Sequence, residues 1–75
     1  MIQQRIKLGA KDVESFVAAA SKCDFDVDIF YNHYIVDAKS LLGVFGLDLT
    51  RVLTVSYNGY NADFEHMLRK QAVAS

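Results

Sequence analysis

The sequence predicts an α+β fold: a two-layer, open-faced sandwich in which helices cover one face of a four-stranded antiparallel sheet. The first observation is size, because 75 residues, 52% of them hydrophobic, suffice for a single small domain over residues 1–75. The second is that apolar residues alternate in four segments and recur with helical spacing in three others. The third is the order of these segments, β-α-β-β-α-β-α, for which two packed layers are the natural solution.

The first part of the chain is predicted to form a strand and then a helix. Residues 2–8 alternate as a strand does, with Gln4 as the exception on the apolar face. From Asp12 to about Lys22 the spacing becomes helical, and the Asp12 side chain is expected to cap the free backbone N–H groups of the first turn. The strand face holds Ile2, Ile6 and Leu8, and the helix stripe holds Val13, Phe16, Val17 and Ala20.

A hairpin is predicted next. Residues 27–31 and 34–37 have strand spacing and are separated by the dipeptide Asn32-His33. Asparagine tolerates the positive φ that a two-residue turn needs, and histidine does so less well than glycine.

The remaining elements are a short helix, a strand and a last helix. We expect the short helix at residues 40–46 and the strand at residues 52–57. Asn61 is expected to cap the last helix. The apolar stripe of that helix consists of Phe64, Met67, Leu68 and either Gln71 or Ala72.

Charge and cysteine content exclude several classes of function. Eight basic and nine acidic residues give a net charge of −1 without any basic run, so nucleic-acid binding is not expected. Cys23 is the only cysteine, which predicts neither a disulfide framework nor a zinc cluster and fits a reducing, cytoplasmic compartment. No apolar run is long enough to span a membrane, and polar Gln3, Gln4 and Arg5 are not typical of a signal peptide. No metal or other cofactor is expected.

Two stretches of the chain resemble the HPr family, the small phosphocarriers of the bacterial sugar phosphotransferase system. They are Ala20-Ser21-Lys22-Cys23-Asp24-Phe25-Asp26-Val27, continuing to Tyr31-Asn32, and Val36-Asp37-Ala38-Lys39-Ser40-Leu41-Leu42-Gly43-Val44. The second is similar to the family's Ala-Lys-Ser-Ile-Met-Gly-Val segment, whereas residues 1–19 match only in pattern. The resemblance implies an open-faced sandwich with sheet order 1-4-2-3.

The resemblance also implies that histidine phosphotransfer has been lost. The family's phosphate-accepting histidine lies in a loop before the first helix, and Gly9 occupies that position here. Lys11 stands at the family's arginine, and the acidic Asp12 replaces a proline. Glycine offers neither an imidazole nor a charge stabiliser, so no catalytic residue is assigned and the protein is not expected to be an enzyme. The loop at residues 8–12 is expected to be short, with no cleft beside it.

A regulatory serine is the second family site, and here the motif is retained at Ser40. Some bacterial relatives are phosphorylated at this serine by the HPr kinase/phosphorylase and then bind a transcriptional regulator; the histidine-less catabolite repression HPr keeps only this branch. A serine at a helix start lies where free N–H groups favour an anion. The resemblance therefore predicts phosphorylation of Ser40 and carbon catabolite control through protein binding. The predicted partner-binding residues are Lys39, Leu41, Leu42, Gly43 and Phe45.

Each of these assignments has a simpler alternative. Ser40 is also an ordinary helix cap, worth about 1 kcal/mol. Leu41, Leu42 and Phe45 belong to a helix too short to bury all of them, so one is expected to be exposed beside the serine. The alternative is that all three pack inward.

Two other functions stay open from the sequence: a constitutive interaction scaffold without phosphorylation, and a phosphocarrier by family membership only. His33 is expected in a turn, His66 on the outer side of the last helix and Cys23 in packing contacts, with no metal role for any of them. Four tyrosines would form a binding surface only if their rings shared one open face. We expect a monomer or a weak dimer.

Overall fold

The computed structural model describes residues 1–73 and contains the predicted elements in the predicted order. One short 3-10 helix, η1, is added before the first α-helix. The elements are β1 (Ile2–Ile6), η1 (Ala10–Asp12), α1 (Val13–Ser21), β2 (Val27–Tyr31), β3 (Tyr34–Asp37), α2 (Leu41–Phe45), β4 (Leu53–Tyr57) and α3 (Ala62–Gln71).

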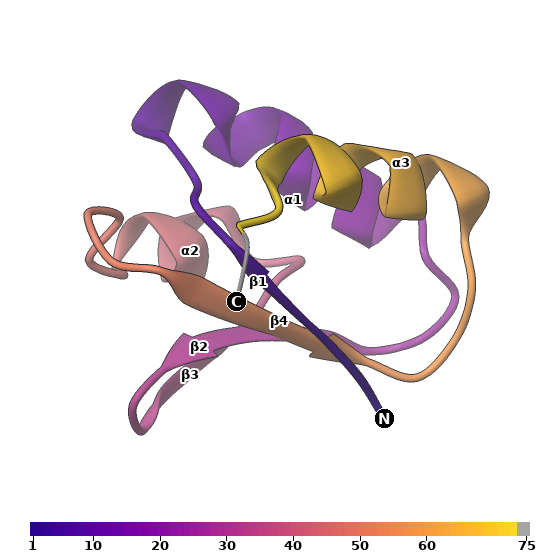
Figure 1. Ribbon diagram of the computed structural model, residues 1–75, viewed down its shortest axis with the longest axis horizontal. Helices are drawn as coiled ribbons and strands as arrows, with labels where there is room; N and C mark the ends of the chain where they lie inside the picture. Colours follow the sequence, from indigo (N-terminus) through magenta and orange to yellow (C-terminus); the bar gives the residue numbers. More distant parts are fainter. Residues whose placement is uncertain (74–75) are drawn as a thin grey trace.

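The four strands form one antiparallel sheet in the order β1-β4-β2-β3, which confirms the predicted topology. Helices α1 and α3 lie side by side over one face of this sheet, and the short α2 lies at its side, in contact with α1 and β3 (Figure 1). β1 and β3 are therefore the edge strands, whereas β4 and β2 are central.

The core lies between the sheet and the two long helices. Phe16 of α1 and Phe64 of α3 are fully buried, with ring centroids 6.3 Å apart, and the Tyr57 ring meets Phe64 edge-on at 5.3 Å. Burial of a large apolar side chain of this kind stabilises a fold by about 1.5–3 kcal/mol. The predicted stripe of α1 is buried as expected: Val13, Phe16, Val17 and Ala20.

Local backbone geometry confirms the predicted turn and two predicted caps. Asn32 has φ 51°, the left-handed conformation that a two-residue hairpin turn requires. The Asn61 side chain accepts a hydrogen bond of 2.9 Å from the Phe64 N–H, and Ser40 Oγ accepts one of 3.1 Å from the Gly43 N–H. These bonds satisfy backbone donors that a helix start leaves unpaired.

The structure corrects two predictions at the start of the chain. The first strand ends at Ile6, because the Lys7 N–H donates to the carbonyl oxygen of Gln71, the last residue of α3, and leaves the β1–β4 ladder. Asp12 occupies the N-cap position of α1, yet its side chain makes no capping hydrogen bond. Its backbone has φ −101° and ψ −3°, a conformation close to helical, since it already belongs to η1.

The apolar face of the first strand is also less buried than predicted. Ile6 and Leu8 are buried, but Ile2 keeps 46% of its surface exposed. Ile2 lies opposite Tyr57 on the edge strand β1, and no further strand of residues 1–73 lies beyond it. Alternation alone cannot distinguish an edge position from a central one.

Candidate functional site

The candidate site is the short helix α2 with the serine that precedes it. Ser40 has extended backbone angles (φ −100°, ψ 108°), and its exposed hydroxyl caps the first turn. The first turn contains no acidic residue. Ser40 Oγ is therefore accessible at a helix start, as the sequence predicts.

Gly43 lies close to Ser40 and to β3. A Cβ atom at position 43 would lie 3.0 Å from Ser40 Oγ and 3.4 Å from the Val36 Cβ. The first distance is tighter than ordinary van der Waals contact, so a side chain at Gly43 would require a small shift of the serine hydroxyl.

Lys39 points its charge into the fold rather than towards Ser40. Its half-buried side chain donates from Nζ to the Cys23 carbonyl oxygen at 3.0 Å, just beyond the end of α1. Its backbone N–H donates to Asp37 Oδ1 at 2.8 Å. Lys39 thus ties α1 to the β3–α2 connection.

The outward side of α2 is apolar. Leu42 is 85% exposed, Phe45 43% and Leu41 39%, whereas Val44 is the side chain that packs into the core. The sequence predicts one exposed residue among the three, whereas all three are exposed. A helix of five residues between a cap and Gly46 has room for only one buried anchor.

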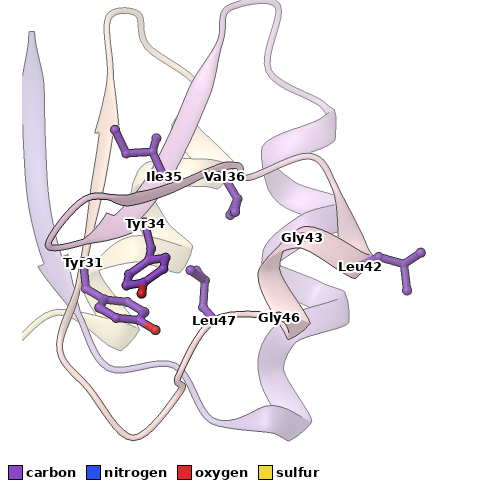
Figure 2. Close-up of a pocket in the computed structure, with 8 residues that line it drawn as sticks. All are labelled: Tyr31, Tyr34, Ile35, Val36, Leu42, Gly43, Gly46 and Leu47. Carbon is purple, nitrogen blue, oxygen red and sulfur yellow. The ribbon is translucent and has the colours of Figure 1, made fainter.

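A shallow groove lies between α2 and the hairpin, with a volume of about 440 Å³. Figure 2 shows the rings of Tyr31 and Tyr34 next to each other on the hairpin side, while Gly43 and Gly46 leave the facing side of α2 bare. Ring centroids of Tyr31 and Tyr34 are 5.4 Å apart. The full lining is Tyr31, Tyr34, Ile35, Val36, Leu42, Gly43, Gly46 and Leu47.

Sequence reasoning missed most of this groove. Two of the four tyrosines, Tyr31 and Tyr34, do share one open surface, whereas Tyr57 is buried and Tyr60 projects elsewhere. The available signals were two tyrosines flanking a two-residue turn and glycines three residues apart on a short helix. Arg51 also belongs to this region, because its guanidinium lies 5.2 Å from the centre of the Tyr31 ring.

Residues 8–12, which align with the family's histidine loop, contain the short 3-10 helix η1. Gly9 is exposed with φ −78° and ψ 153°, and its carbonyl accepts a 2.9 Å hydrogen bond from the Asp12 N–H. Lys11 is exposed in η1. Residues 8–12 line neither the groove at α2 nor a second cavity beside Asp26 and Asp28.

The remaining candidate residues, two histidines and the cysteine, lie in the hairpin turn, on the surface of α3 and in the core. His33 is exposed in the hairpin turn and stacks on Tyr34, and His66 is exposed on α3. Cys23 is buried, and this burial raises the pKa of its thiol. Within residues 1–73, no group of three or more His, Cys, Asp or Glu side chains is arranged to hold a metal ion, and no helix is long and apolar enough to cross a membrane.

The geometry brings together a capped serine, an exposed apolar helix and a shallow groove. No protein-family model matches the chain, and comparison with curated proteins finds no relative. The likeness to HPr therefore depends on the residues quoted above and on the shared element order.

Proposed function

We propose that this protein is a cytoplasmic, non-catalytic regulatory module of the HPr type, which binds a partner protein through α2 and is controlled by phosphorylation of Ser40. One observation carries the proposal. Ser40 is exposed, and the short helix that it caps carries three exposed apolar side chains, those of Leu41, Leu42 and Phe45. An apolar patch on the surface of so small a domain is typical of a protein contact site.

Phosphorylation would change the charge of this patch without requiring a new fold. A phosphate adds about −1.5 to −2 charges and three acceptor oxygens. The first turn of α2 has no carboxylate to repel it, and the N–H of Gly43 already points at Ser40 Oγ. The neighbouring Lys39 ammonium, which donates to the Cys23 carbonyl, has further N–H donors for the phosphate, and a turn of this side chain towards Ser40 would loosen the link between α1 and α2.

Loss of phosphotransfer supports a regulatory role over a carrier role. The chain has no histidine before His33, and Gly9 supplies no nucleophile at the position where the family has one. We expect phosphoenolpyruvate and enzyme I to leave no acid-labile label on the protein. A label on His33 would contradict this expectation and restore the carrier function.

Intact-mass analysis after incubation with ATP and an HPr kinase/phosphorylase tests the proposal. We expect one added phosphate on the wild-type chain and on Ser21→Ala, a matched control at an exposed serine that ends α1. Ser40→Ala should gain none. No modification of the wild type, with the same kinase active on an ordinary HPr, would disprove the regulatory branch.

A second candidate function is a constitutive interaction scaffold. It is favoured by a specific observation: Ser40 Oγ and the Lys39 ammonium are both already used in hydrogen bonds within the fold. A scaffold would bind its regulator with the same affinity before and after kinase treatment. Leu42→Lys, which places a charge in the most exposed part of the patch, should weaken that binding in either case.

A further inference from the structure

The two edges of the sheet are treated differently in this fold. The outer edge of β1 is covered by the chain itself: the Val73 N–H donates to Arg5 O at 3.1 Å, and the Lys7 N–H donates to Gln71 O at 3.0 Å. A bridge between Ile6 and Ala72 completes this cover. No segment within residues 1–73 pairs with the outer edge of β3.

The alternation of hydrogen-bonded and non-hydrogen-bonded pairs in the hairpin determines which backbone groups of β3 point outward, away from β2. Tyr31 and Tyr34 close the two-residue turn, so they form a hydrogen-bonded pair, and such pairs alternate along an antiparallel ladder. The Ala38 N–H donates to Val27 O at 2.8 Å, which fits the same alternation. The backbone of Val36 therefore points inward to β2, while the N–H and C=O of Ile35 and the N–H of Asp37 point outward.

This outward edge carries no lysine, proline or bulge. Edge strands commonly carry a lysine, a proline or a bulge that prevents pairing with another strand. β3 reads Tyr-Ile-Val-Asp, pairs in regular register, and exposes 62% of Ile35 and 55% of Tyr34. Outside the hairpin ladder, no hydrogen bond of residues 1–73 uses the N–H or C=O of Ile35.

We propose that β3 pairs antiparallel with β3 of a second copy of this chain, about a two-fold axis at Ile35. In this register Ile35 lies opposite Ile35 of the second copy, and the two residues exchange both of their outward hydrogen bonds. Tyr34 lies opposite Val36 of the second copy, which adds an apolar contact on the helix side of the sheet. The two four-stranded sheets become one of eight strands, an isologous contact that closes on itself.

Charge complementarity favours a second copy over an unrelated strand. The two-fold register brings the turn residue His33 of each copy near Asp37 of the other. Once its ring leaves Tyr34, the imidazole N–H can donate to the Asp37 carboxylate oxygen that does not accept the Lys39 N–H. Asp37 lies opposite Asp28 within its own hairpin, a like-charge pair that is unfavourable in a sheet. A donor from the second copy offsets that repulsion twice in each dimer. The contact is small, so the dimer is a weak one.

Sedimentation equilibrium with four variants tests the pairing. We expect the wild-type mass to rise from that of an 8.4 kDa monomer towards twice that value between about 10 μM and about 1 mM. Ile35→Lys should remain monomeric. His33→Asp should weaken association several-fold, because it places an aspartate opposite Asp37 of the other copy. His33→Lys should retain association. Tyr60→Lys is the matched control, an exposed residue outside β3 and outside the groove between β3 and α2, and it should dimerise as the wild type does.

Amide hydrogen exchange gives a second, residue-specific measurement. The Ile35 N–H should become protected as protein concentration rises, whereas the Val36 N–H, which belongs to the hairpin ladder, should be protected at all concentrations. A monomer over the whole concentration range would overturn the proposal. So would a dimer that survives Ile35→Lys or is lost in Tyr60→Lys, since it would use a different surface. Binding of an unrelated extended peptide to β3 without self-association would also overturn it.

Discussion

At the scale of single residues, Gly59 shows how a missing side chain allows an aromatic cluster to form. A Cβ atom at this position would lie 2.3 Å from Cδ2 of the Phe25 ring, far inside van der Waals contact. The Phe25 ring in turn stacks on Tyr57, with centroids 5.8 Å apart. Gly59 is therefore required for close packing of the loop after β4 against the segment before β2.

We predict that Gly59→Ala destabilises the protein by about 1–3 kcal/mol, because Phe25 must leave its stacked position. Urea unfolding measures this loss. Gly9→Ala is the matched control: a Cβ there meets nothing nearer than 3.5 Å, and the backbone conformation suits any residue. The control should be neutral or slightly stabilising. Equal stability of the Gly59→Ala variant and the wild type would show that the Phe25 stack contributes nothing.

At the scale of elements, the predicted order was confirmed wherever apolar periodicity and a polar cap agree. α3 is the clearest case, because Asn61 caps it and the buried Phe64 and Leu68 follow at helical spacing. The start of α1 is the contrary case: Asp12 has the residue type of a cap, but η1 places its backbone in a near-helical conformation. A local turn that precedes a helix leaves no periodic signal in the sequence.

The candidate site was predictable only in part for a similar reason. Ser40 and the apolar residues of α2 are adjacent in sequence, so the motif alone places them together. The groove instead joins α2 to Tyr31 and Tyr34, which only the packing of α2 against β3 brings near. Likewise, the use of Lys39 in a bond to Cys23 depends on how α1 ends, 16 residues earlier in the chain. Contacts between distant segments follow from the fold and not from spacing.

The cap of α3 leads to a prediction at this scale. We predict that Asn61→Ala lowers the free energy of unfolding by about 1 kcal/mol, since the Phe64 N–H loses its acceptor. Asn61→Asp, which keeps an acceptor at the helix start, should recover most of this loss. Thermal unfolding followed by circular dichroism compares the three proteins. A loss that persists in Asn61→Asp would mean that the amide, and not the cap, stabilises this turn.

At the scale of the whole molecule, a domain of 75 residues has a small margin of stability, so single buried groups affect it measurably. Tyr57 is such a group. It is buried in the central strand β4, and its hydroxyl donates to a carboxylate oxygen of Glu65 on α3. This bond connects the sheet to the helix layer, and the tyrosine can make it only while it keeps its proton.

Burial, and after it the hydrogen bond to Glu65, raise the pKa of Tyr57 well above its usual value of 10. Below about pH 10, the usual pKa of tyrosine, the Tyr57 hydroxyl keeps its proton in both the folded and the unfolded chain, and its contribution to stability is fully present. Above it the unfolded chain loses the proton while the folded chain retains it, so the unfolded state is favoured by up to about 1.4 kcal/mol per pH unit.

We predict that urea unfolding between pH 9 and pH 11.5 shows this alkaline loss of stability. In Tyr57→Phe the slope of the unfolding free energy against pH should be smaller by the equivalent of one proton. Other groups that ionise in this range do so in both proteins, so the difference between the two slopes isolates Tyr57. Tyr60→Phe, at an exposed tyrosine, should keep the wild-type slope, and an unchanged slope in Tyr57→Phe would assign the alkaline loss to other groups.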